Sequence, residues 1–159
     1  MKMPMTQGFK KGFGLLEAVI SIAVVSISLF SLAAVGQISF KASSEAARDI
    51  KAGYLGEEGF EALKTIRDNG WPGISSFSQE QDYFLFFSGG SWQATTSPQT
   101  IDGVFSRKFV LSPVYRDASD NIVSSGALDP DSRRAVLTVS WGQGKSRVFI
   151  TYLTNLFQN

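Results

Sequence analysis

The chain of 159 residues has room for one small globular domain besides an apolar N-terminal segment, since domains usually contain about 100–150 residues. It has no cysteine and no histidine, which excludes disulfide bonds, thiol chemistry, Cys/His zinc sites and a histidine general base. The formal charge is +1, and the basic excess lies in the first twelve residues, which hold three lysines and no acid. Elsewhere the basic residues are dispersed among acids, so no nucleic-acid partner is predicted.

A long uncharged run follows this basic leader. No Asp, Glu, Lys or Arg occurs in the 23 residues from Ala18 to Phe40, and as a helix they would span about 34 Å. The hydrocarbon core of a bilayer is about 30 Å thick, so the run is long enough to cross it. A basic end before an apolar run is the pattern of a secretory signal or of a signal anchor, and the positive-inside tendency keeps Lys10 and Lys11 on the cytoplasmic side. As an anchor, the run predicts a single-pass protein of the cytoplasmic membrane with an extracytoplasmic C-terminal domain.

Glu17 stands at the start of this run, where a carboxylate is unusual. At membrane depth a charged side chain costs about 2.5 kcal/mol or more, so it is normally paired or functional. Cleavage of the Gly12–Phe13 bond would create a positive α-amino group on Phe13. In a helical array, the amine of a neighbouring subunit would then pair with Glu17.

The leader, Gly12, Phe13 and Glu17 together resemble the class III signal of type IV prepilins and type II secretion pseudopilins. That signal is a short basic leader ending in Gly, followed by Phe and by Glu as the fifth mature residue. The resemblance implies cleavage after Gly12 by the prepilin peptidase, N-methylation of Phe13 and a role for Glu17 in assembly. The earlier pair Gly8–Phe9 does not fit, because the fifth residue counted from Phe9 is Phe13.

The same resemblance implies a non-enzymatic filament subunit that needs no cofactor. Its partners would be membrane lipid, other pilin subunits and an assembly platform in the membrane driven by a separate ATPase. Two departures favour a minor subunit: Ala34 stands where many major pilins have proline, and the C-terminal cysteine pair of many pilins is missing. The final location would be a cell-surface or periplasmic filament.

Two other classes of function remain as alternatives. One is a membrane-anchored binding module with an uncleaved signal anchor, which would keep Met1 or be cut near Ala34. The other is a secreted hydrolase, for which Asp102, Asp117 and Asp120 supply acids but no spacing that marks a catalytic pair.

One helix is predicted from the leader to about Arg67, with an apolar half (13–40) and an amphipathic half (41–68). Gly70 and Pro72 supply its stop signal. Three glycines inside it indicate either close packing or flexibility. The amphipathic half has apolar residues at three- and four-residue steps: Ala42, Ala46, Ile50, Tyr54, Leu63 and Ile66.

Residues 72–159 predict an antiparallel β domain, which makes the fold class α+β and pilin-like. We expect the sheet to lie across Ala42–Ile66, and the third strand to end at Pro113. The aromatic residues Phe84, Phe86, Phe87, Trp92 and Phe149 are expected in the core. The predicted strands are Asp82–Phe87, Ser91–Thr95, Val104–Tyr115, Ala135–Trp141 and Ser146–Leu153.

A loop rich in oxygen ligands follows the third strand. Asp117, Asp120, Asp129 and Asp131 are the types of residue that calcium prefers, but they lack the spacing of a known calcium loop. The same residues are ordinary turn formers, which is the alternative interpretation, and no metal site is predicted. Arg133–Arg134 are expected at the solvated start of a strand rather than in a phosphate site.

Overall fold

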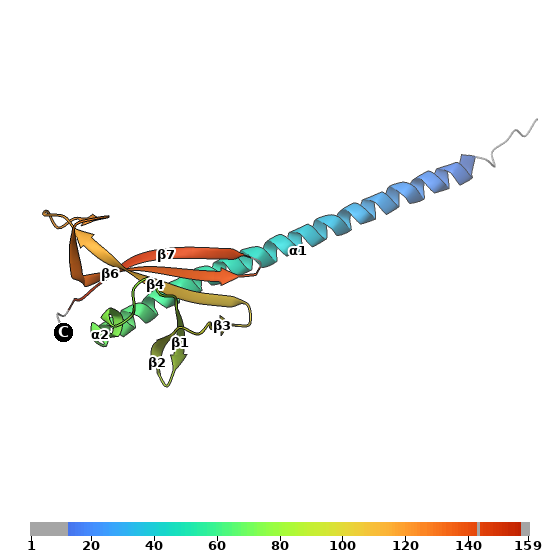
Figure 1. Cartoon of the computed structure of the whole chain (residues 1–159). Helices are drawn as coiled ribbons and strands as arrows, with labels where there is room; N and C mark the ends of the chain where they lie inside the picture. The colour runs from blue at the N-terminus through green and yellow to red at the C-terminus, as the bar shows by residue number, and fades with distance from the viewer. Residues whose placement is uncertain (1–12, 143, 157–159) are drawn as a thin grey trace, which may run out of the picture. The chain divides into compact units, whose positions relative to one another are not determined.

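The computed structural model describes residues 13–142 and 144–156 and has an α+β fold (Figure 1). A helix of 56 residues, α1 (Phe13–Asp68), is followed by a short helix α2 (Pro72–Ser75) and an antiparallel sheet. The chain divides into two compact units, residues 1–46 and 47–159, and the boundary lies inside α1. The C-terminal part of α1 packs on the sheet within the second unit, as the sequence predicts for an amphipathic helix.

The end of α1 follows the predicted stop signal. The amide of Gly70 donates to the carbonyl of Arg67 at 2.9 Å, and Gly70 has a φ of +134°, which favours glycine. Pro72 then begins α2, where its fixed φ suits the first helical position. The helix therefore ends within one residue of the expected position.

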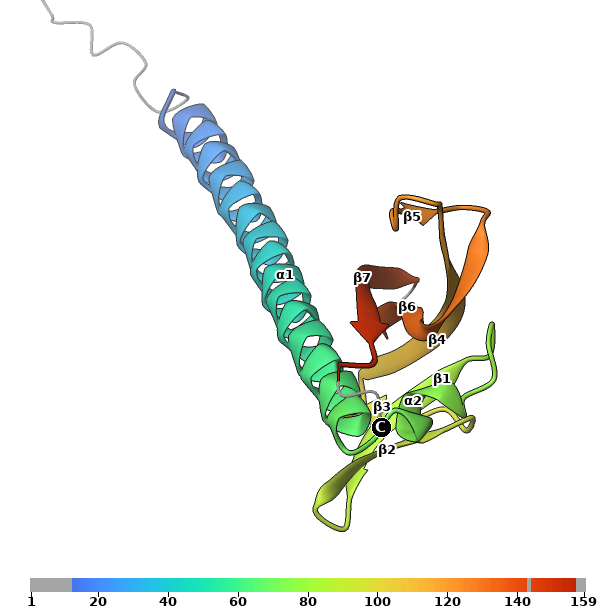
Figure 2. The ribbon, with the colours of Figure 1, turned by 90° about the vertical axis from the view of Figure 1, so that its left-hand side faces the viewer.

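The sheet has the strand order β2-β1-β4-β6-β7, and all of its pairings are antiparallel. Two short strands, β3 and β5, pair with β4 off this path and were not predicted, since each has two residues. The five predicted strands are present, and Figure 2 shows β4 and β6 as the long central pair. The bounds are β1 (Tyr83–Ser88), β2 (Ser91–Thr95), β3 (Thr100–Ile101), β4 (Phe105–Arg116), β5 (Ile122–Val123), β6 (Ala127–Trp141) and β7 (Lys145–Thr154).

Two predicted strand limits are wrong. β4 continues through Pro113 to Arg116, because the ladder shifts register between Pro113 and Val114, and a bulge tolerates a residue without an N–H donor. β6 begins at Ala127 rather than Ala135. Its first residues are mostly exposed, so they carry no apolar alternation that sequence could reveal.

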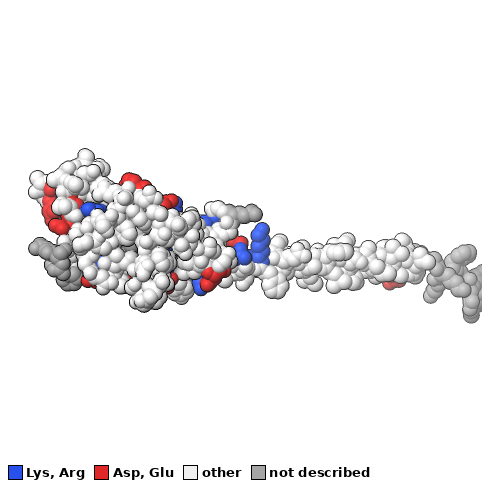
Figure 3. Space-filling model, turned by 60° about the horizontal axis from the view of Figure 1, so that its bottom comes forward, with Lys and Arg blue, Asp and Glu red and all other residues white. Residues whose placement is uncertain are grey.

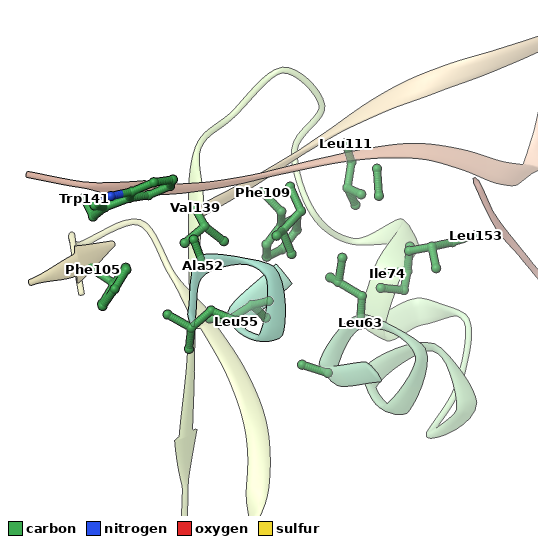
Figure 4. Close-up of a cluster of buried hydrophobic side chains, with 14 of the residues drawn as sticks. Ala52, Leu55, Leu63, Ile74, Phe105, Phe109, Leu111, Val139, Trp141 and Leu153 are labelled. Carbon is green, nitrogen blue, oxygen red and sulfur yellow. The ribbon is translucent and has the colours of Figure 1, made fainter. Parts of the chain in front are cut away.

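The core lies between α1 and one face of the sheet (Figure 4). Alternate residues of β4 and β6 enter it, as their period of two predicts, and all are almost completely buried. Leu63 and Ile74 contribute from the two helices. The sheet residues on this face include Phe105, Phe109, Leu111, Ala135, Leu137, Val139 and Trp141.

The face of α1 that enters the core agrees with the prediction only near the end of the helix, where Leu63 is buried and Ile66 packs against the core. Ile50 and Tyr54 are exposed, and the helix residues of the core begin at Ala52, so the sheet does not extend across the whole of Ala42–Ile66 as expected. The reason is that, apart from Leu55 and Leu63, small residues form the buried contact face. A Cβ atom on Gly56 would collide with the ring of Phe149, and one on Gly59 with Leu137. The interior glycines therefore serve close packing against sheet side chains, the first of the two interpretations.

The aromatic residues expected in the core are only partly there. Phe84 is buried, and Trp92 and Phe149 are half-buried against the core. Phe86 is also half-buried, whereas Phe87 is 61% exposed, so its prediction is wrong. Phe87 lies opposite Trp92 in the β1–β2 hairpin and packs edge-on against it, with ring centroids 5.4 Å apart. This cross-strand pair gives Phe87 an apolar contact outside the core.

Candidate functional site

Two residues of the resemblance, Phe13 and Glu17, lie in the first turns of α1. Lys10, Lys11 and Gly12 fall outside the described residues, and Phe13 is the first residue of the helix. Glu17 follows Phe13 by four positions, which is about one turn of an α-helix. The helix geometry is therefore compatible with a carboxylate near the predicted new N-terminus.

Glu17 lies on an apolar helix surface without a charged partner. The carboxylate is exposed, and Leu16, Ile20 and Ser21 flank it. Among the residues that the structure describes, none forms an ion pair or hydrogen bond with Glu17. A cation that neutralises this carboxylate must therefore come from outside the described residues.

The surface around Glu17 is apolar on every side of the helix. Large apolar side chains from Leu15 to Phe40 are more than half exposed, and Figure 3 shows this part of α1 almost free of charged atoms. A helix that is apolar all round belongs in a membrane or inside an assembly. Within the described residues, α1 is the one helix long and apolar enough to cross a bilayer, which is consistent with a single-pass membrane protein.

Three of the five serine hydroxyls in residues 13–40 are satisfied within the helix. Ser26, Ser28 and Ser31 each donate to the carbonyl four residues earlier, at 2.7–2.8 Å. Such bonds remove the cost of placing an unpaired hydroxyl in a medium without water. The segment therefore suits an apolar environment despite its serines.

The loop between β4 and β5 uses its acids as turn formers. Both oxygens of Asp117 accept from the side chain of Asn121, and Asp117 Oδ1 also accepts from the amides of Ser119 and Asn121. These bonds, led by that from the Asn121 side chain, hold the pKa of Asp117 below its ordinary value. Asp120 has a positive φ, as expected in a tight turn. No group of three or more acids within residues 13–142 and 144–156 is placed to hold a metal ion.

Asp129 is engaged with Arg116 across the β4–β6 hairpin. Arg116 Nε donates to Asp129 Oδ2 at 2.6 Å, and the carboxylate is only 14% exposed. This hydrogen bond is the main reason that the pKa of Asp129 lies below its ordinary value and that of Arg116 above. Asp131 accepts from the side chain of Asn155 instead. The four predicted calcium candidates therefore do not converge on one point.

The Asp129–Arg116 pair predicts that the stability of the β domain falls at acidic pH. A carboxyl with a lowered pKa in the folded state stabilises the fold above its unfolded pKa, and this contribution is lost as pH falls through the folded pKa. We expect the domain to lose stability below about pH 4, and Asp129→Asn to lose less over the same range. Tryptophan fluorescence during thermal unfolding measures this, with Glu57→Gln as the control for removing one exposed carboxylate. Identical pH profiles for the wild type and Asp129→Asn would contradict the assignment.

Arg133 and Arg134 lie inside β6, so their prediction at a strand start is wrong. Arg133 turns to the inner side, where its guanidinium lies 5.8 Å from the Trp71 ring and donates to two backbone carbonyls. Arg134, its neighbour along the strand, points to the opposite face. The two consecutive arginines therefore lie on opposite faces of the sheet, because successive residues of a strand alternate between its faces.

No protein-family model, curated protein or solved structure matches the chain.

Proposed function

We propose that the chain is a structural subunit of a type IV pilus or of a type II secretion pseudopilus. In this proposal the prepilin peptidase cuts after Gly12, the new N-terminus at Phe13 is methylated, and the mature protein is held in the cytoplasmic membrane before assembly. It then joins a helical filament through its apolar helix. The missing proline at Ala34 and the lack of cysteine favour a minor subunit.

One observation carries the proposal: Glu17 has no cation within the described residues and lies one helical turn after Phe13. A neighbouring subunit, displaced along the filament, would supply the amine of its own Phe13. The apolar surface from Leu15 to Phe40 would pack against the same segment of other subunits. Lipid would cover this surface before assembly, so one segment would serve both as anchor and as filament core.

Mass spectrometry of the mature N-terminus, from cells that contain a prepilin peptidase, tests the proposal. We expect a chain that begins with N-methylated Phe13. Gly12→Val is expected to abolish processing, because a branched side chain replaces the glycine at the cleaved bond. Gly8→Val is the matched control, since it alters the other Gly-Phe pair and is expected to be processed normally.

The other outcomes identify the alternatives. A wild-type chain that retains Met1 favours the uncleaved anchor of a binding module, and a chain cut near Ala34 favours an ordinary secreted protein. Either result contradicts the filament subunit.

A further inference from the structure

A cleft of about 470 Å³ lies on the face of the sheet opposite the helix, where β4 and β6 extend towards β5. Figure 2 shows β5 at the far end of this pair of strands. The register shift after Pro113 changes which residues of β4 face each side, and buried Val114 contributes to the lining. The lining residues are Ser112, Pro113, Val114, Tyr115, Ile122, Val123, Ser124, Arg134 and Tyr152.

Arg134 gives this cleft a positive charge that nothing in the described chain neutralises. It is half-buried and makes no hydrogen bond or ion pair with any described residue. The carboxylates of the loop after β4 and of the start of β6 are engaged elsewhere, Asp120 and Asp129 by Arg116 and Asp117 by Asn121. A planar guanidinium with free donors suits a carboxylate, which it can bind through two parallel hydrogen bonds.

The neighbours of Arg134 are a hydroxyl on one side and an aromatic ring on the other. Arg134 on β6 is the direct cross-strand partner of Ser112 on β4 and of Tyr152 on β7, so its Cβ atom is about 4.5–5.5 Å from the Cβ atom of each. Tyr115 adds a second ring, and Ser124 a second hydroxyl, from the β5 side. The cleft therefore combines one cation, two tyrosine rings and two serine hydroxyl groups.

We propose that this cleft binds an acidic saccharide. The uronate carboxylate would accept from the Arg134 guanidinium, a sugar ring would pack its C–H face on Tyr152, and hydroxyl groups would bond to Ser112 and Ser124. A peptide carboxylate would satisfy Arg134 equally, but the paired rings and hydroxyls match a ring that has an apolar face and polar edges. The inference does not depend on filament assembly, because it concerns the β domain alone.

The test is a calorimetric titration of the full chain with trigalacturonate. The protein is held in a polyoxyethylene detergent, which has no sugar headgroup to compete. We expect saturable binding that weakens as salt is added, since the contact is partly electrostatic. Arg134→Gln should weaken binding about tenfold or more, which corresponds to the loss of a charge-assisted pair. Arg134→Lys should recover only part of the affinity, because a point charge lacks the planar fork.

Arg133→Gln is the matched control, because it removes a guanidinium from the adjacent position on the other face of β6. It should bind trigalacturonate like the wild type, and thermal unfolding checks that each variant is folded at the titration temperature. Maltotriose, which is neutral, should not bind measurably. Failure of trigalacturonate to bind, equal binding of maltotriose, equal binding of a glutamate-containing tripeptide, or unchanged affinity of Arg134→Gln would each overturn the proposal.

Discussion

Replacing Arg107 by alanine is expected to destabilise the β domain by about 3 kcal/mol, as large-to-small changes in cores do. The side chain is 2% exposed on β4, among the buried residues that face α1. Its guanidinium Nη1 donates to the Leu55 carbonyl at 3.0 Å and to Glu58 Oε2 at 2.7 Å. The guanidinium also lies 5.0 Å from the Trp92 ring. Alanine would remove these contacts and leave a cavity beside Gly59.

The change Arg107→Met separates packing from charge. Methionine fills much of the same space and removes Nε, which has no hydrogen-bond partner among the described residues. An unpaired buried donor costs about 1–3 kcal/mol, so its removal offsets part of the lost polar contacts. The Glu58 side chain is half exposed, so in this variant water hydrates its carboxylate and no buried charge is left unpaired. We expect Arg107→Met to cost about 1 kcal/mol, well below the alanine change.

Denaturant unfolding of the full chain in detergent, followed by tryptophan fluorescence, measures both changes. The signal reports the domain, because Trp71, Trp92 and Trp141 all lie in the second unit. Glu58→Gln is the control that weakens the ion pair without a cavity, and its effect should be below about 1 kcal/mol because the carboxylate is half exposed. Equal losses for alanine and methionine would show that charge, not packing, holds Arg107 in place.

Periodicity predicts the sheet far better than it predicts the helix face. The alternation in β4 and β6 identifies their buried residues, because the period of a strand needs only apolar and polar classes. On α1 the buried face contains Ala52, Gly56 and Gly59, which carry little hydrophobic signal. The apolar residues Ile50 and Tyr54 are exposed instead, so the hydrophobic pattern selected the wrong side of this part of the helix, whereas its prediction for Leu63 is confirmed.

The Glu17 site can be predicted from the sequence, whereas the Arg134 cleft cannot. A carboxylate at the start of an apolar run is visible in the sequence itself, so Glu17 can be identified without the structure. Arg134 becomes distinctive only through register, since its neighbours Ser112 and Tyr152 come from other strands. The register shift after Pro113 is likewise known only from the strand pairing, because the proline in the sequence does not by itself indicate a bulge.

Glu17→Ala is expected to be cleaved normally and to assemble poorly. The proposed cleavage is at the Gly12–Phe13 bond, which the change does not touch, and alanine makes the candidate membrane-spanning segment more apolar. Assembly, in contrast, would lose the one charge on this surface that can bind a neighbouring amine. We expect at least a tenfold fall in subunit incorporated into sheared filaments, since a charge pair in an apolar medium is worth more than about 1.4 kcal/mol.

Two further variants separate charge from shape. Glu17→Gln keeps the size and hydrogen bonding of the side chain but removes its charge, so it should assemble as poorly as alanine. Ser21→Ala, one helical turn further along the same side, alters a polar but uncharged group and should assemble like the wild type. Immunoblots of membrane and filament fractions give the processed and incorporated amounts for each variant. Normal incorporation of Glu17→Gln would mean that register comes from apolar packing alone, because a neutral amide cannot hold a protonated amine as a carboxylate does.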